Sequence, residues 1–191
     1  MKSQNHEINN LKIRKAVGII LIRKDGFVWT GKRKLGPGVR FGEKKLWQMP
    51  QGGIDEGEKP IEAAFRELEE ETGSKSAKLL FESEDWLEYK LPNELIGKVL
   101  KGFRGQKQKW FLMEFNGSDE EFNLNNYTPE FDEWCWRDLK TMPNLVVDFK
   151  KPLYERLVEI FLEKIEEYKI CLLYTSPSPR DVEESRMPSC A

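Results

Sequence analysis

Three glutamates, Glu67, Glu70 and Glu71, stand at the i, i+3 and i+4 positions of one short acidic run. On a helix, this spacing places all three carboxylates on one arc of the surface. They would repel one another by about 0.2–0.5 kcal/mol per pair on an exposed helix, and by more where water is restricted. A divalent cation removes that repulsion, and magnesium binds a few carboxylates together with water and substrate phosphates. Because 34% of the residues are charged, a solvated acidic face explains the run alone at least as well.

Pro60 and Gly73 mark the ends of the helix that carries these acids. Proline suits the first helical position, and glycine suits the left-handed position just past the end, so the predicted helix spans residues 60–72. The apolar side chains that recur at the spacing of one buried face are Ile61, Ala64, Phe65 and Leu68. The acids are therefore expected beside this face, where backbone oxygens of the preceding Gly52-Gly53 turn can join them around a metal.

The whole stretch resembles the signature box of the Nudix hydrolases. The matching positions are Gly52, Glu58 and the run Arg66-Glu67-Leu68-Glu69-Glu70-Glu71-Thr72-Gly73. Ser74 departs from the pattern, since the family usually has an aliphatic residue there, and it weakens a packing contact without removing a ligand. The resemblance implies an α/β fold of the Nudix α/β/α sandwich type. It also implies a pyrophosphohydrolase that acts on acid anhydrides with Mg²⁺, for which Mn²⁺ can substitute.

The rest of the chain supplies the elements that must position this helix. Apolar runs and turn signals predict strands over 16–22, 27–30, 46–49, 78–84, 86–91, 106–115 and 130–136, and a terminal helix over about 152–169. Phe131, Trp134 and Trp136 cannot share one face of a regular strand, so a bulge or an exposed aromatic side chain is expected there. Strands interleaved with two helices predict a mixed β-sheet between helices.

Length and composition favour a single domain. With 191 residues, of which 39% are hydrophobic, the chain suffices for one well-buried core. We expect a flexible leader over 1–12 and a Nudix domain over 13–170. From Cys171 onward, the sequence CLLYTSPSPRD looks like translated read-through of a sequencing-library adapter, so 171–191 are expected to be a non-native or disordered tail.

The composition also excludes several classes of site, and the charges are distributed unevenly along the sequence. His6 is the only histidine and Cys135 the only cysteine before the tail, which excludes a disulfide framework and a cysteine zinc site. The chain shows neither a secretory signal nor a membrane span, which favours a cytoplasmic protein. The net charge is −2, yet residues 31–45 and 97–109 are strongly basic and residues 114–136 are acidic.

Four further segments resemble the Nudix hydrolases that remove pyrophosphate from RNA 5′-triphosphate ends, which initiates mRNA decay, or that split dinucleoside polyphosphates. These segments are 47–53, 86–92, 105–111 and 129–132. By this resemblance, the metal ligands are Gly52, Glu67, Glu70, Glu71 and Glu130. The catalytic acids are Glu70, Glu71 and Glu130, any of which can take the proton of the attacking water.

The same resemblance assigns the substrate-binding residues. Arg14 and Arg33 match positions that hold 5′ phosphates, Gln106 joins the substrate site, and the pocket for a base near the RNA end matches Val147, Phe149 and Lys150. Each has a simpler alternative: Arg33 could belong to a solvated charge run, and Phe149 could be core, as is favoured for Tyr89 and Trp86. Residues 36–45 could extend a basic funnel for RNA or be only a loop.

Three functions stay open on the sequence. The first is an enzyme that converts RNA 5′-triphosphate ends to 5′-monophosphates, the second is a dinucleoside polyphosphate hydrolase, and the third is a non-catalytic nucleotide-binding module. The third is disfavoured because every acid of the box is present. The expected partner is an RNA 5′ end or a dinucleoside polyphosphate, with no membrane, and the expected assembly is a monomer.

Overall fold

The structure is a computed structural model that describes residues 11–34, 46–100, 102–125 and 127–175. Its centre is a mixed eight-stranded sheet whose main path runs β3-β2-β1-β7-β5. The strands are β1 (Lys12–Ile22), β2 (Val28–Arg33), β3 (Trp47–Gln48), β4 (Gln51–Gly53), β5 (Ala77–Glu82), β6 (Leu87–Lys90), β7 (Phe103–Phe115) and β8 (Phe131–Arg137). The basic loop 36–45 and most of the predicted leader lie outside the described residues, although Lys12 already belongs to β1.

The two longest strands, β1 and β7, form the spine of the sheet. They pair in parallel along their whole shared length, whereas β2 and β4 pair antiparallel with β1, and β5 and β6 pair antiparallel with β7. Residues 16–22 of β1 are all buried, as the continuous apolar run predicts for a strand covered on both faces. The predicted mixed sheet is therefore confirmed.

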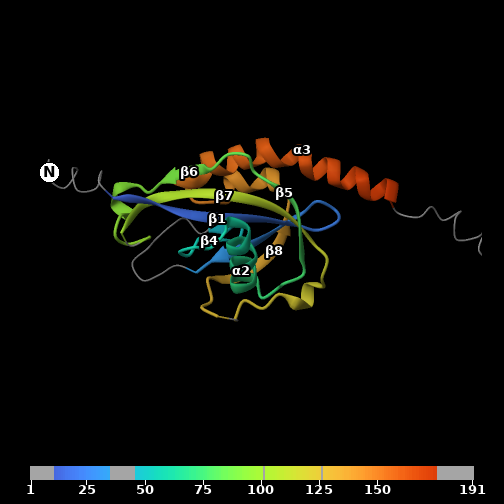
Figure 1. Cartoon of the computed structure of the whole chain (residues 1–191), viewed down its shortest axis with the longest axis horizontal. Coiled ribbons are helices and arrows are strands. Elements are labelled where there is room, and N and C mark those ends of the chain that lie inside the picture. The colour runs from blue at the N-terminus through green and yellow to red at the C-terminus, as the bar shows by residue number, and fades with distance from the viewer. Residues whose placement is uncertain (1–10, 35–45, 101, 126, 176–191) are drawn as a thin grey trace, which may run out of the picture.

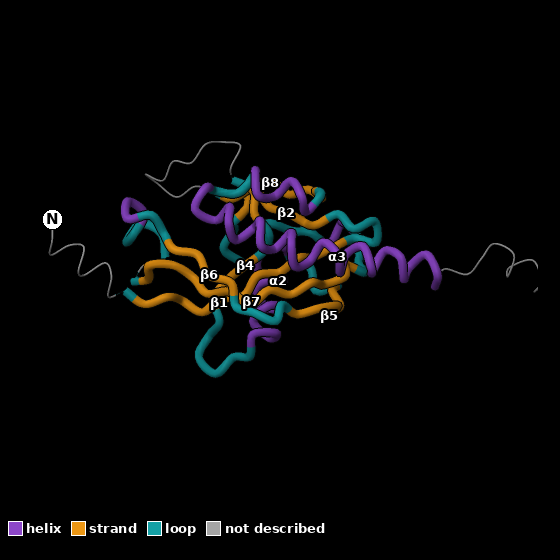
Figure 2. Tube along the Cα trace, turned by 90° about the horizontal axis from the view of Figure 1, so that it is seen from above, coloured by secondary structure: helices purple, strands orange, loops and turns teal. Residues whose placement is uncertain are grey.

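Helices α2 (Pro60–Thr72) and α3 (Lys151–Thr175) cover opposite faces of this sheet, and Figure 2 shows α3 running along it (Figure 1). In the described part of the chain, four short 3₁₀ turns connect the other elements: η2 (Asn93–Leu95), η3 (Asp119–Glu121), η4 (Leu139–Asn144) and η5 (Asp148–Lys150). The core accordingly has two parts. One lies under α3 and includes Trp110 and Tyr154, and the other lies under α2 and includes Trp29 and Phe111.

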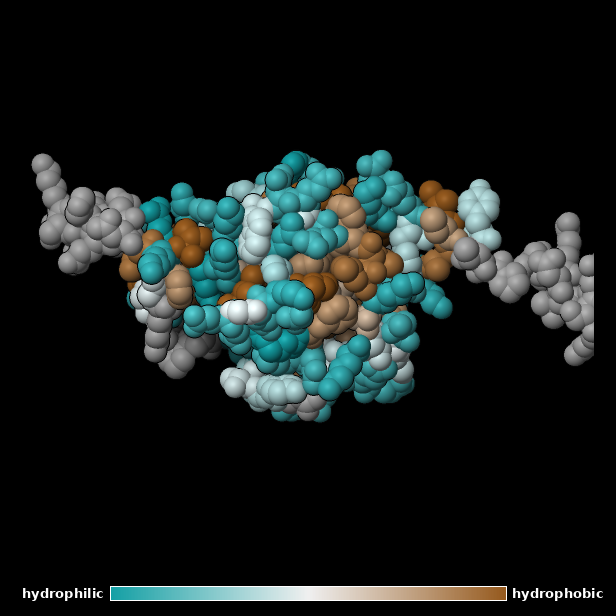
Figure 3. Space-filling model, in the orientation of Figure 1, coloured by the Kyte–Doolittle hydropathy of each residue, from teal (hydrophilic) through white to brown (hydrophobic). Residues whose placement is uncertain are grey.

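Helix α2 has the predicted bounds, and Gly73 takes the left-handed conformation that ends it, with φ of 81°. The predicted buried face was wrong in one respect. Phe65 is exposed, whereas Ala63 and Glu71 are buried. Glu71 therefore faces the strands beside Ala64 and Leu68, and Gly52 of β4 leaves room for the Glu67 carboxylate. Phe65 and Leu79 of β5 are both exposed. Figure 3 shows that hydrophobic residues reach the surface on the face of the molecule seen there.

Strand β8 contains the predicted irregularity. Its register with β2 shifts between Lys32 and Arg33. This bulge lets Phe131 join Trp134 and Trp136 on one side of the sheet, where all three pack in the core under α2. The aromatic side chains therefore share a face despite their odd spacing.

Helix α3 carries the predicted apolar stripe, since Leu153, Leu157, Phe161 and Ile165 are buried under it. It continues beyond the predicted end to Thr175, but Leu173 and Tyr174 in this extension are exposed. Assigning 171–191 to a non-native tail therefore stays a prediction. In the described part of the chain, no helix is long and apolar enough to cross a membrane.

Candidate active site

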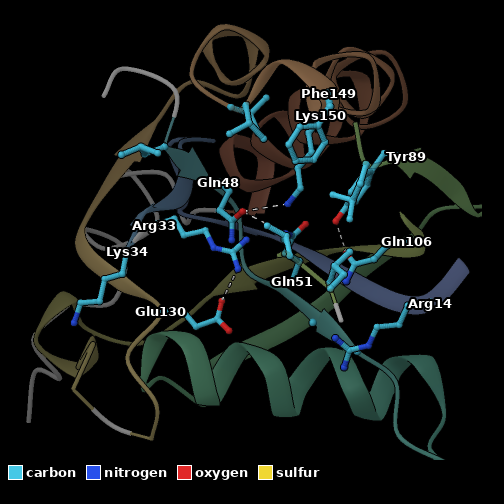
Figure 4. Close-up of a pocket in the computed structure, with 18 of the residues that line it drawn as sticks. Arg14, Arg33, Lys34, Gln48, Gln51, Tyr89, Gln106, Glu130, Phe149 and Lys150 are labelled. Atoms are coloured by element: carbon cyan, nitrogen blue, oxygen red, sulfur yellow. Dashed lines mark hydrogen bonds and ion pairs between the residues drawn. The ribbon is translucent and has the colours of Figure 1, made fainter. Parts of the chain in front are cut away.

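A pocket of about 490 Å³ lies between the sheet, α2 and the turn that precedes α3 (Figure 4). It brings together every predicted site residue except one. Those that line it are Arg14, Arg33, Gly52, Glu67, Glu70, Gln106, Glu130, Val147, Phe149 and Lys150. Acids, cations and an aromatic compartment from segments far apart in the sequence therefore share one cavity.

Arg66 fixes the acidic end of this pocket. Its guanidinium donates two hydrogen bonds of 2.8 Å to the Glu58 carboxylate, one of 2.8 Å to Glu67 and one of 2.8 Å to the carbonyl of Gly53. A fifth, longer hydrogen bond reaches Glu70 at 3.4 Å. The hydrogen bonds from Arg66 lower the pKa of the Glu58 carboxyl to about 2. Arg66 thereby ties α2 to β4, so that the acids stay at the glycine turn.

The two glycines of β4 are required because charged groups occupy the space beside them. A Cβ added at Gly52 would overlap the carboxylate of Glu67, and one added at Gly53 would overlap the guanidinium of Arg14. A carboxylate and a cation thus approach the same stretch of backbone from two directions. The backbone of β4 therefore brings an acidic and a basic side chain to adjacent residues.

Glu71 is the predicted site residue that does not line the pocket in the described structure. It is only 7% exposed, and its carboxylate accepts a hydrogen bond of 2.9 Å from the backbone N–H of Gln51. Burial, reinforced by the negative charge of Glu130, raises the pKa of the Glu71 carboxyl well above its usual value. Burial also raises the pKa of Glu67. Burial therefore disfavours the ionised forms of Glu71 and Glu67 behind the glycine turn.

These acids suit a hard divalent cation, although they do not form a ready-made centre. Among the described residues, no three acidic, histidine or cysteine side chains converge closely enough to hold a metal ion. The candidate donors are all oxygens, which favours Mg²⁺ or Mn²⁺ over softer metals. A cation would also relieve the repulsion among the buried carboxylates. The donor chemistry therefore fits the predicted metal.

The basic residues at the end of β2 are each matched by an acid of β8 or its approach. Lys32 pairs with Glu133 at 2.8 Å, Lys34 approaches Asp132 at 3.6 Å, and Arg33 approaches Glu130 at 4.0 Å. Arg33 is thus more than a solvated charge, since it lines the pocket beside a predicted metal ligand. Its loose contact leaves the guanidinium able to bind a phosphate.

The opposite end of the pocket is aromatic and contains a buried cation. The rings of Phe149 and Tyr89 lie 5.7 Å apart, and the Lys150 ammonium lies 5.1 Å from the centre of the Tyr89 ring. Burial, with the nearby charge of Arg33, lowers the pKa of Lys150 to about 7. Tyr89, which was expected to be core, belongs to the core and also lines the pocket, as Phe149 does, whereas Trp86 is not in the lining.

Sequence reasoning missed several lining residues, including Lys34, Gln48, Gln51 and Lys98. The two glutamines lie within the segment 47–53 that carries the family resemblance, but nothing in that motif distinguishes ligand-facing from buried amides. Ser74, the departure from the Nudix pattern, is buried and donates a hydrogen bond of 3.0 Å to Glu121. A polar bond therefore replaces the expected apolar contact at the end of α2.

Comparisons with known proteins identify the family of the chain. The family model of the NUDIX domain matches residues 12–157. The chain is 49% identical over 158 residues to an RNA pyrophosphohydrolase of Brucella anthropi, covering 80% of this chain and 91% of that protein. It is 45% identical over 166 residues to an RNA pyrophosphohydrolase of Mesorhizobium japonicum, covering 84% and 96%.

Solved structures share the fold at lower identity. A C. elegans Ap4A hydrolase in a binary complex gives a TM-score of 0.56 at 21% identity, covering 80% of this chain and 99% of that one. The E. coli dihydroneopterin triphosphate pyrophosphohydrolase gives 0.54 at 18% identity, covering 77% and 97%. The match to the family model and the identity to the bacterial relatives show that this chain belongs to the Nudix hydrolase family.

Proposed function

We propose that this enzyme removes pyrophosphate from RNA 5′-triphosphate ends and leaves a 5′-monophosphate, the step that initiates mRNA decay. The observation that carries the proposal is one continuous pocket with carboxylates at one end and an aromatic compartment at the other. A substrate that fills both ends has a polyphosphate joined to a nucleoside. The RNA pyrophosphohydrolases named above, at 49% and 45% identity, support the same reading.

In this proposal, each group of side chains has a distinct task. Arg14 and Arg33 bind the phosphates from opposite sides of the pocket, and Gln106 donates its amide N–H between them. Val147, Phe149 and Lys150 form the compartment for a base near the RNA end. Magnesium, held by Glu67, Glu70, Glu71, Glu130 and the carbonyl of Gly52, would neutralise the polyphosphate and lower the pKa of a bound water.

The water that attacks phosphorus must lose a proton to the protein. Glu70 and Glu130 line the pocket, whereas Glu71 is buried behind Gln51. We therefore assign the base to Glu70 or Glu130, and we assign Glu71 to holding charge at the metal. Attack forms one P–O bond and breaks the anhydride P–O bond of the leaving pyrophosphate.

The alternative is a dinucleoside polyphosphate hydrolase, because the same cations and base compartment would accept a polyphosphate that carries a nucleoside at each end. We favour RNA because basic residues 97–109 reach the pocket through Lys98, which offers contact to phosphates beyond the first nucleotide. We further propose that the enzyme acts as a monomer in the cytoplasm.

The test is product analysis. The protein with Mg²⁺ should convert a short 5′-triphosphorylated RNA to its 5′-monophosphate and release pyrophosphate in equal amount. Glu70→Gln should lower turnover by orders of magnitude while the protein stays folded, because Glu70 is partly exposed and packs little. Release of orthophosphate alone, or full activity of Glu70→Gln, would contradict the proposal.

A further inference from the structure

Four buried glutamines form one hydrogen-bonded network beneath the pocket. Gln48, Gln51, Gln106 and Gln108 are 4%, 9%, 4% and 0% exposed. Gln108 donates from Nε2 to the Oε1 atoms of both Gln51 and Gln106 at 2.9 Å. Gln51 in turn donates from Nε2 to Oε1 of Gln48 at 3.3 Å. The network therefore connects the strand β7 to the strand β3 across the floor of the site.

The direction of the bonds in this network is set by the indole of Trp110, which can only donate. The indole N–H of Trp110 donates to Oε1 of Gln108 at 3.1 Å, which obliges the amide N–H of Gln108 to point at the next two glutamines. At the far end, the Lys150 ammonium donates to Oε1 of Gln48 at 3.2 Å (Figure 4). The Oε1 atom of Gln48 therefore accepts both hydrogen bonds, one from Gln51 and one from Lys150, and the N–H groups of Gln48 take part in neither.

The Nε2 atom of Gln48 is buried and has no hydrogen-bond partner among the described residues. Buried amide donors are nearly always satisfied, since leaving one unpaired is costly. Gln48 also lines the pocket. The missing acceptor therefore belongs to what the pocket binds.

We propose that the Gln48 amide donates a hydrogen bond to an acceptor oxygen or nitrogen of the substrate, and that Gln108 is a positioning residue that orients this donor through Gln51. The proposal rests on the proposed function only for the choice of substrate. The acceptor is a phosphate oxygen or a base atom, because both ends of the pocket adjoin Gln48. Gln108 itself does not reach the substrate, since it is fully buried and absent from the pocket lining.

A double-mutant cycle on KM tests both parts. Gln48→Met should raise KM about three- to tenfold, because one neutral hydrogen bond to the substrate is lost. The value of kcat should change less than twofold. Gln108→Met should raise KM by a similar factor. The double variant should be no worse than the poorer single variant, because Gln108 acts through Gln48. Leu157→Ala, in the core under α3, is the control that lowers the melting temperature and leaves KM unchanged.

Two chemically altered RNAs identify the group of the substrate that accepts the hydrogen bond from Gln48. The effect of Gln48→Met should vanish on RNA with a methylphosphonate at the first internucleotide linkage if the acceptor is that phosphate, and on RNA abasic at the second nucleotide if it is a base. Persistence of the effect on both RNAs would assign the acceptor to the 5′-triphosphate. An unchanged KM for Gln48→Met, or additive effects of the two substitutions, would each overturn the proposal. Should Gln108→Met not fold, Gln108→Glu, which also lacks the N–H donors, takes its place.

The same cycle separates this inference from the proposed function. It is measured on 5′-triphosphorylated RNA and on diadenosine tetraphosphate. If the second substrate proves the better one, the proposed function fails, while non-additivity of Gln48 and Gln108 on that substrate would still support the network.

Discussion

Gly52→Ala is the substitution for which the site geometry predicts the clearest loss of activity. The added Cβ would lie less than 3.0 Å from all three atoms of the Glu67 carboxylate, where ordinary contacts are 3.4–4 Å. The carboxylate must therefore move by more than ~1 Å, and a shift of ~1 Å in a catalytic arrangement can cost about 100-fold in rate. Since the clash involves the end of a flexible side chain and not backbone, we expect the fold to survive.

The assay is steady-state hydrolysis over a range of Mg²⁺ concentrations, with the melting temperature measured in parallel. Gly52→Ala should lower kcat about 100-fold and raise the Mg²⁺ concentration needed for half-maximal rate. Gly26→Ala is the matched control. Gly26 has φ of 85° in the turn between β1 and β2, beside Lys169 and away from the pocket, so it should lose stability by about 1–2 kcal/mol and keep its activity.

Two results would refute this reasoning. If Gly52→Ala kept its activity within threefold of the parent, Glu67 would not be needed where the structure places it. If it lost activity only in proportion to unfolded protein, as judged against Gly26→Ala, the effect would be one of folding and not of metal geometry.

Four further perturbations follow from the same structure. The pKa of Lys150 is lowered to about 7 from 10.5, so the unfolded state binds more protons between these values and stability should rise with pH. Relative to Lys150→Met, the free energy of unfolding should therefore increase by about 2 kcal/mol from pH 7 to pH 9 in denaturant titrations, and a constant difference would contradict the burial argument. Truncation after Ile170 should leave the melting temperature and activity within error, because the helical residues beyond it are mostly exposed; a large loss of either would show that the tail packs. Arg33→Ala should lower the rate on RNA by weakening phosphate binding. Phe149→Ala should weaken RNA binding by about 1–3 kcal/mol, because the stacking surface for a base is lost. An equal effect of Phe149→Ala on the hydrolysis of inorganic tripolyphosphate would contradict a base contact.

Much of the fold could be predicted because local signals mark its elements. Pro60 and Gly73 define α2, and the buried run 16–22 defines the central strand. Apolar spacing correctly predicted that Ala64 and Leu68 of α2 are buried, but it wrongly added Phe65 to the buried face. It could not show that Glu71 is buried, because its carboxylate bonds to the backbone N–H of Gln51 in another element.

The acids and cations of the site were predicted by resemblance, and the structure brings all but Glu71 to one pocket. The glutamine network was beyond sequence reasoning. One face of β7 carries Gln106, Gln108 and Trp110, because they occupy alternate positions of the strand. Their partners Gln48 and Gln51 lie in β3 and β4, far from β7 in the sequence. Only the arrangement of the sheet shows that these amides meet.

Substrate choice is the central claim, and one comparison tests it most directly. The kcat/KM values with Mg²⁺ are measured for a short 5′-triphosphorylated RNA, a nucleoside triphosphate and diadenosine tetraphosphate, each at low and moderate salt. RNA should give the highest value, and its advantage should shrink as salt rises, because contacts to additional phosphates weaken with ionic strength. A higher value for diadenosine tetraphosphate at both salt concentrations would contradict the RNA assignment and identify a dinucleoside polyphosphate hydrolase instead.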